Sequence, residues 1–149
     1  MGRASIIEAY IQRLLAWNKP ITPAILKAIA DEMGITQGEL DAINLKVKAH
    51  LTRGRNFVEF GCLDNAIDEL NQAKSINPAD LEVLRTLAEI HNLRYTDENS
   101  LADREYGLLI AQRCLELKPN DKEALALIKS LEHDADPKEV ARQTKPNIY

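Results

Sequence analysis

Residues 51–78 read LTRGRNFVEFGCLDNAIDELNQAKSINP, and this stretch decides the fold. Small and large residues alternate in it at the spacing that two paired helices need. Gly54 and Ala66 would let the helices approach closely, while Phe57 and Leu70 would fill the space around that contact. The stretch therefore predicts one antiparallel helical hairpin.

The same stretch has the boundaries of a repeat unit. Gly61 and Cys62 predict the turn between its two helices, and Pro78 closes it, because proline cannot continue a helix. A weaker copy follows over residues 81–119 and ends at Pro119 in the same way. A repeated helical hairpin is a stacking unit, and stacked hairpins form grooves that bind other proteins.

The first unit resembles the tetratricopeptide repeat, whose signature is W-x2-L-G-x2-Y, then A-x3-F, then P, over about 34 residues. The positions that match the signature, together with the proline that ends the second unit, are Gly54, Phe57, Gly61, Ala66, Leu70, Ala73, Pro78 and Pro119. The unit departs from the signature twice, because His50 stands at the tryptophan position and Arg53 at the leucine position.

The second unit matches the family less closely. Its first helix would use Leu84, Leu87 and Ala88, and its second helix would use Gly107, Ala111 and Cys114. The two closing prolines are 41 residues apart. The excess over the family period is about one extra turn on each helix, so it predicts a longer hairpin. A third unit begins at Asp121 and supplies a single helix, as the cap of a helical solenoid would.

The composition suits a soluble all-helical protein of one domain, or of one domain with a small appendage. The chain has 149 residues, of which 45% are hydrophobic and 28% charged, with a net charge of −4. Residues 56–135 hold sixteen acidic side chains against eight basic ones, which argues against a nucleic-acid platform there. The two cysteines lie far apart, and no apolar segment has the length of a signal peptide or a membrane span. A reducing cytoplasm is the compartment we expect, for a chain that is either complete or part of a longer protein.

Side chains that cap helices predict most of the helix boundaries. The predicted starts are Ser5 with Glu8, Thr22 before Pro23, Thr36 with Glu39, Asp64, Asp80, Ser100 with Asp103, and Asn120 with Glu123. The first helix is expected to end near Asn18, the second at Gly34, and the fifth at a polar turn over residues 96–99. Asp136-Pro137 and Glu139 predict a short helix within a polar tail, residues 134–149.

The N-terminal segment, residues 1–46, lies outside the repeats and has two interpretations. As a helical hairpin it would cap the array, or pair with a second copy of the chain through Ile11, Leu14 and Trp17. Alternatively, residues 22–45 resemble a helix-turn-helix that would place the helix after Thr36 in a DNA groove. That helix is acidic in its first turns and would repel phosphate, so DNA binding is the weaker alternative.

In tetratricopeptide proteins the first helix of each repeat lines a concave face on which a partner segment lies. The resemblance implies lining residues Lys48, Leu51, Thr52, Arg55 and Glu59 from the first unit and Glu82, Arg85, Glu89 and Asn92 from the second. The basic residues of this set could clamp a carboxylate of the partner. The alternative is a solvated face of mixed charge, in which Arg85 pairs with Glu82 and Glu89 on its own helix. The family's carboxylate-clamp variant also uses asparagines at lining positions, which Thr52 and Arg55 do not supply, so recognition of chaperone tails is not expected.

No motif predicts an enzyme, a metal site or a cofactor. His50 and His91 are about one repeat apart, and we expect them to fill space between helices. Cys114 is expected in the core, and Cys62 is expected in an exposed turn. The sequence thus predicts an N-terminal helical hairpin (residues 1–46), a tetratricopeptide-like superhelix with a capping helix (residues 47–133), and a tail. The expected function is that of a scaffold or adaptor that holds a peptide or helix of another protein.

Overall fold

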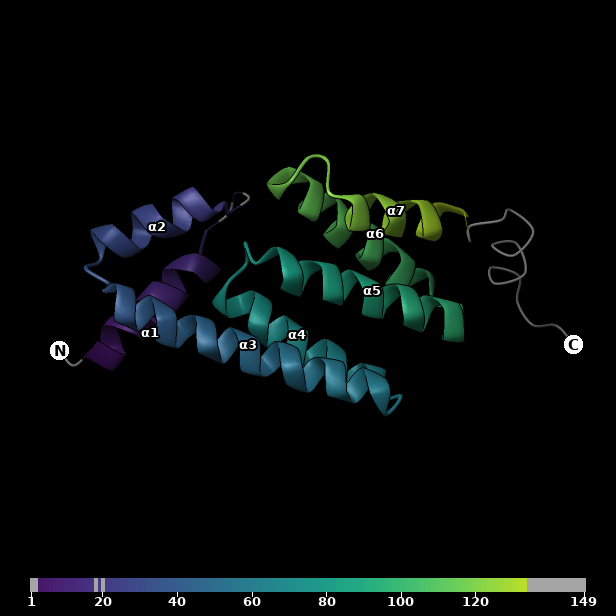
Figure 1. The fold of residues 1–149 in the computed structure, drawn as a ribbon, viewed down its shortest axis with the longest axis horizontal. Helices are drawn as coiled ribbons and strands as arrows, with labels where there is room; N and C mark the ends of the chain where they lie inside the picture. The colour runs from purple at the N-terminus through teal and green to yellow at the C-terminus, as the bar shows by residue number, and fades with distance from the viewer. Residues whose placement is uncertain (1–2, 18, 20, 134–149) are drawn as a thin grey trace, which may run out of the picture. The chain divides into compact units, whose positions relative to one another are not determined.

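The computed structural model describes residues 3–17, 19 and 21–133, and this part of the chain is all-α, as predicted. Its helices are α1 (Arg3–Leu15), α2 (Pro23–Glu32), α3 (Gln37–Glu59), α4 (Leu63–Ile76), α5 (Leu81–Glu98), α6 (Leu101–Leu117) and α7 (Lys122–His133) (Figure 1). No strand occurs within these described ranges. None of the described helices combines the length and the apolar character that a bilayer crossing needs.

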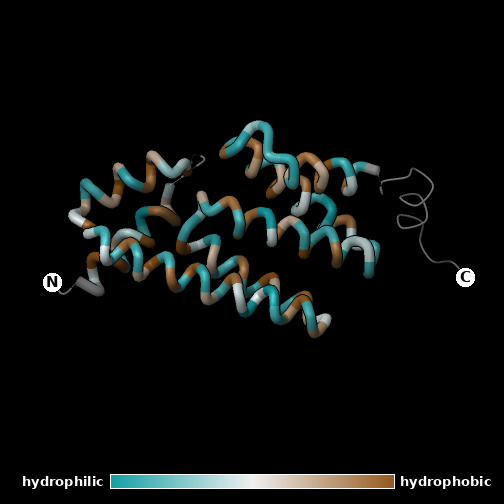
Figure 2. The backbone as a smooth tube through the Cα atoms, viewed as in Figure 1, coloured by the Kyte–Doolittle hydropathy of each residue, from teal (hydrophilic) through white to brown (hydrophobic). Residues whose placement is uncertain are grey.

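The chain forms two compact units, Met1–Leu84 and Arg85–Tyr149. The division falls within α5, whose first turn belongs to unit 1 and whose remaining turns belong to unit 2. Along each helix, hydrophobic residues recur among hydrophilic ones, so that one side of the helix can be buried (Figure 2).

Four of the predicted helix starts are confirmed. Thr22 accepts the backbone N–H of Ile25 at 3.3 Å, with Pro23 in the first turn. Thr36 and Glu39 form a reciprocal capping box, with bonds of 3.2 and 2.9 Å. The Asp80 and Ser100 side chains cap α5 and α6 by accepting the N–H groups three residues later, at 3.0 and 3.3 Å. Each of these side chains satisfies a backbone donor that the helix leaves open.

Three predicted caps are wrong. Helix α1 already begins at Arg3, so Ser5 lies inside it. Helix α4 begins at Leu63, and Asp64 lies in its first turn, where the helix dipole also favours a carboxylate. Helix α7 is capped by Asp121, not Asn120, because the Asp121 carboxylate accepts the N–H of Ala124 at 3.0 Å.

The predicted turn over residues 96–99 is also wrong, because α5 continues to Glu98. The chain reverses only at Asn99, which adopts φ of 54°. Asparagine tolerates this left-handed conformation better than most residues do. Helix α2 ends before Gly34, whose φ is 70°, as predicted. Helix α1 ends at Leu15, about one turn before the expected end near Asn18. The whole tail, residues 134–149, with its predicted short helix, lies outside the described residues.

Unit 1 is built around the antiparallel pair α3 and α4 (Figure 1). Helix α3 is unbroken from Gln37 to Glu59, across Gly54, and a Cβ atom at Gly54 would overlap the Cδ2 atom of Leu70. Leu70 itself is fully buried. The remaining core residues of this pair are Ile43, Val47, Leu51, Ala66, Ile67 and Ala73. Close approach at the glycine therefore joins the two helices, as the sequence predicted; Phe57, however, is only half-buried.

The N-terminal hairpin completes unit 1. Helices α1 and α2 are connected by an ion pair between Arg13 and Glu32 at 2.8 Å, and α1 also contacts α4. Tyr10 and Leu14 on α1 and Ile29 on α2 are buried. Burial of these side chains removes apolar surface from water and attaches the hairpin to the α3–α4 pair.

Unit 2 contains the rest of α5 together with α6 and α7. Its small residue Gly107 is buried, and a Cβ atom there would lie 3.0 Å from Cδ1 of Leu131 on α7. The close approach around Gly107 thus involves α7. Ala111 and Cys114 on α6 and Ala124 on α7 are fully buried. This unit repeats the use of small residues at helix contacts that unit 1 shows.

Candidate partner-binding surface

An exposed stripe runs along α3 in unit 1. Lys48, Thr52, Arg55 and Glu59 are spaced by four, three and four residues, which places them on one side of the helix. All four are exposed. Leu51, the fifth residue predicted for this surface, belongs to the core instead, with 5% exposure, because it continues the buried row of Ile43 and Val47. We call the four exposed residues the α3 stripe.

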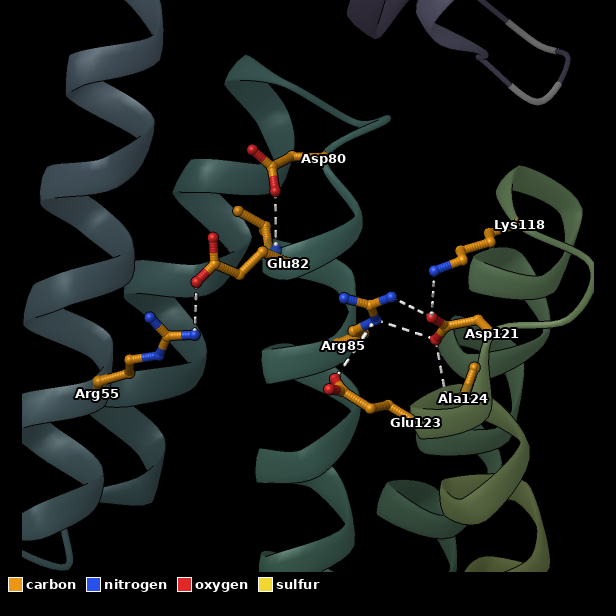
Figure 3. A network of polar contacts seen from close by, with 9 residues as sticks. Arg55, Asp80, Glu82, Arg85, Lys118, Asp121, Glu123 and Ala124 are labelled. Atoms are coloured by element: carbon orange, nitrogen blue, oxygen red, sulfur yellow. Dashed lines mark hydrogen bonds and ion pairs between the residues drawn. The ribbon is translucent and has the colours of Figure 1, made fainter.

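Arg55 of the α3 stripe forms an ion pair with Glu82 at the start of α5, with 2.9 Å between its guanidinium nitrogen and the Glu82 Oε1 (Figure 3). The two side chains are 50% and 57% exposed. Exposed ion pairs of this kind contribute about 0–1 kcal/mol, because water screens them and two long side chains lose freedom. The Arg55–Glu82 pair is therefore expected to contribute little to stability by itself.

Arg85 in unit 2 has a different role. Its guanidinium forms a two-pronged contact with the Asp121 carboxylate, which is 2% exposed, and Glu123 lies 3.4 Å from Nε (Figure 3). The hydrogen bond from Arg85 lowers the pKa of Asp121 below 3.8, and the bond to Asp121 raises the pKa of Arg85. The expected pairing of Arg85 with Glu82 and Glu89 is wrong, because Arg85 links α5 to the cap of α7.

The other predicted lining residues of unit 2 are Glu89, which is exposed, and Asn92, which is half-buried. The Oδ1 atom of Asn92 is buried and has no hydrogen-bond partner among the described residues. An unsatisfied buried acceptor costs about 1–3 kcal/mol, so a donor that reached it would be stabilising. Glu82, like the α3 stripe, belongs to unit 1.

His50 and Arg53, the two residues that depart from the repeat signature, belong to one polar cluster between α3 and α4. His50 and Arg53 on α3 both contact Glu69 on α4, with distances of 2.6 Å from His50 Nδ1 and 3.2 Å from Arg53 Nε. The hydrogen bond from His50 is the main reason that the pKa of Glu69 lies below its ordinary 4.5. Sequence reasoning missed this cluster, because Glu69 is 19 residues from His50 and no motif connects them.

A second carboxylate cluster lies in unit 2. Asp103 is 2% exposed, and its Oδ1 lies 2.8 Å from Nδ1 of His91 and 2.9 Å from Nε of Arg94. Burial opposes ionisation of Asp103, but the bonds from Arg94 and His91 outweigh it and lower the pKa of this carboxyl below 3.8. The His91 ring stacks on Tyr106 with centroids 5.6 Å apart. The position of His91 between helices confirms its expected packing role.

The cysteines and the potential metal ligands were predicted from the sequence to be structural, and the structure describes both cysteines. No group of three or more metal-binding side chains occurs among the described residues. Cys114 is buried, as predicted, and burial raises the pKa of its thiol to about 11, far above the range in which it would act as a nucleophile. Cys62 is exposed, also as predicted, and both thiols are free.

The two other predicted interaction sites lie in unit 1. At the start of α3, the proposed DNA-reading helix, Gln37 donates to Asp41 at 3.0 Å, and Glu39 is engaged by its own cap. These acidic, internally bonded side chains leave no basic surface in the first turns of α3. Of the residues proposed for self-association, Leu14 is buried with 3% exposure and is unavailable to a second copy, whereas Trp17 is 36% exposed.

Comparison of the chain with protein-family models, with curated proteins and with solved structures found no match.

Proposed function

We propose that this chain is a non-enzymatic protein-interaction module of the tetratricopeptide type, which holds an extended peptide or a helix of a partner protein. The observation that carries the proposal is the contact of Gly54 with Leu70, where a glycine of α3 lets α4 approach at the positions that the repeat signature specifies. The fully buried Ala66 and Ala73 support it, because they stand at the other small positions of the same signature.

The α3 stripe is the part of the predicted surface that we assign to the partner. Lys48 and Arg55 supply two positive charges, and Thr52 between them supplies a hydroxyl group. We expect the partner segment to carry a carboxylate that takes the place of Glu82 in the ion pair with Arg55, since the existing pair is exposed and weak. Arg85 has no part in this proposal, because the capping of α7 depends on its contact with Asp121.

The module would work in a reducing compartment such as the cytoplasm, where the two free thiols persist. The proposal needs neither a metal nor a cofactor.

The experiment that tests the proposal is comparative affinity purification of the full chain from its native cells. The variant is Lys48→Glu with Arg55→Glu, and the matched control is Lys46→Glu with Lys129→Glu, which makes the same change of charge at exposed residues outside the stripe. We expect specific co-purifying proteins to be lost with the variant and retained with the control, while circular dichroism shows intact folding in both. Equal retention by both variants would contradict the assignment of the α3 stripe.

A further inference from the structure

A pocket of about 500 Å³ opens in unit 1, where α1, α2, α3 and the end of α4 meet. Its volume lies in the range of about 300–1,000 Å³ that is typical of sites for small molecules. The pocket is distinct from the α3 stripe, because its lining uses none of the four stripe residues. All of its lining residues belong to unit 1.

Buried core side chains supply part of the apolar lining of the pocket, to which Tyr10 contributes its ring together with a hydroxyl group. Tyr10, Ile35 and Ile43 line it and are 3%, 6% and 5% exposed, so the surrounding core holds them in place. Half-buried Leu26 and Leu40 extend this apolar lining toward the opening. A ring or a short hydrocarbon chain placed there would leave water without displacing core side chains.

The polar lining residues define what else the ligand must carry. Three are carboxamides: Gln37, Asn44 and Asn77. Gln37 donates its Nε2–H to Asp41, and Asn77 accepts the Ala79 N–H at its Oδ1. Beyond these bonds, Gln37 still has its acceptor Oε1 and a second Nε2–H, Asn77 has its donor Nδ2, and Asn44 can offer both kinds of group to a ligand.

The charges of the lining balance. Lys27 and Asp31 are its charged residues, and they are one turn apart on α2. A charged ligand would meet one attractive and one repulsive group at the opening, and it would lose its hydration on entering the apolar interior. A neutral head group with both a donor and an acceptor, such as a carboxamide, costs less to dehydrate, and hydrogen bonds to the carboxamides of the lining can offset that cost.

We infer that this pocket binds a small uncharged molecule that has an apolar ring or short chain and a head group of the amide type. The apolar part would lie against Tyr10 and Ile43, and the head group would bond to the carboxamides of Asn44 and Asn77. This site is separate from the proposed partner surface, so the two assignments can fail independently.

The test uses three probes that share a phenylethyl group and differ only in the head group: 3-phenylpropanamide, 3-phenylpropanoate and 2-phenylethylamine. Each is titrated into the full chain labelled with ¹⁵N, and the chemical-shift changes of the backbone N–H groups are mapped. We expect 3-phenylpropanamide to bind with Kd of about 1 mM, in keeping with the few atoms of the probe. It should change the signals of residues of α2 and α3 around the pocket. The two charged probes should bind more weakly.

Variants locate the binding. Leu40→Trp enlarges a side chain of the pocket lining and should weaken binding of the amide about 10-fold or more, because the indole occupies apolar space. Leu45→Trp is the matched control on the same helix, since Leu45 is 66% exposed and outside the lining, and it should bind as the unmodified chain does. Should Leu40→Trp disturb folding, Asn44→Ala, at an exposed residue, tests the head-group contact and should weaken binding several-fold.

Three results would overturn the inference. One is the absence of any localised shift with the amide, and another is stronger binding of either charged probe. The third is amide affinity that stays unchanged in both Leu40→Trp and Asn44→Ala.

Discussion

The Nδ1 atom of His50 lies 2.6 Å from the Oε2 atom of Glu69, and this contact joins α3 to α4 at the position where the repeat signature has tryptophan. Arg53 approaches the other oxygen of the same carboxylate at 3.2 Å. Both side chains of the His50–Glu69 pair are 17% exposed, so water screens the contact only in part. The polar cluster therefore contributes to the pairing of α3 with α4.

Replacing Glu69 by glutamine should destabilise unit 1 by about 1–2 kcal/mol, because two charge-assisted hydrogen bonds lose their charged acceptor. Urea denaturation followed by circular dichroism measures this change. The control is Asp68→Asn, which neutralises an exposed carboxylate on the same helix and should change stability by less than about 0.5 kcal/mol. Equal losses in the two variants would show that the cluster adds nothing to the pairing.

Gly54 and Gly38 lie in the same helix and should respond oppositely to substitution by alanine. At Gly54 the new methyl group overlaps Leu70 in the core, and we expect a net loss of about 1–2 kcal/mol, since overpacking exceeds the gain in helix propensity. At Gly38 no atom lies within 4 Å of an added Cβ, so alanine should stabilise the helix by about 0.5–1 kcal/mol. Denaturation midpoints of the two variants test the prediction, and a stabilising Gly54→Ala would refute the close approach.

Asp121 should matter more to stability than its exposed neighbour Glu123, although both contact Arg85. Asp121→Ala removes the cap of α7 and leaves Arg85 without its buried partner, for an expected loss of about 3–5 kcal/mol. Glu123→Ala removes a carboxylate that is 63% exposed and 3.4 Å from Arg85, for a loss of about 0–1 kcal/mol. Hydrogen exchange of α7 amides measures both, and similar protection in the two variants would contradict the role given to Asp121.

Asp103 should make unit 2 sensitive to acid. The pKa of Asp103 is lower in the folded chain than its ordinary 3.8. Near this pH the folded state therefore binds fewer protons than the unfolded state does. The stability that Asp103 contributes is therefore present above that ordinary value and is lost as the pH falls toward the lower folded value. Asp103→Asn should be less stable at pH 7 and should lose less stability between pH 5 and pH 2, as judged from urea midpoints across that range. If the urea midpoints of Asp103→Asn and of the unmodified chain fell in parallel between pH 5 and pH 2, this role of Asp103 would be excluded.

Local signals in the sequence predicted much of the fold, because caps act within three residues. Four predicted caps each accept a backbone N–H three positions ahead, and their role as helix caps is predicted correctly: Thr22, Thr36, Asp80 and Ser100. Asn120 and Asp121 are adjacent and both have side-chain oxygens, so the sequence does not indicate which of the two caps α7. Asp121 is the cap that also bonds to Arg85, 36 residues away.

The candidate surface was predicted less well, because long-range partners decide which charges remain at a surface. The lining residues that the family resemblance implied on α3 include Lys48, Thr52, Arg55 and Glu59, which are exposed, and Leu51, which is buried. Nothing in the spacing of Arg85 indicates that its guanidinium bonds to a buried carboxylate on another helix. The clusters of Glu69 and Asp103 were missed for the same reason.

The central claim is that the α3 stripe contacts a partner protein, and site-specific photo-crosslinking tests it most directly. A benzophenone amino acid is placed at Thr52 in the stripe, or at Lys46 on another side of α3, and the full chain is irradiated in its native cells. The proposal predicts a discrete crosslinked protein from position 52 that is missing from position 46 and disappears when Lys48→Glu and Arg55→Glu are added. The same crosslinks from both positions, or a crosslink from position 52 that survives the charge reversal, would contradict it.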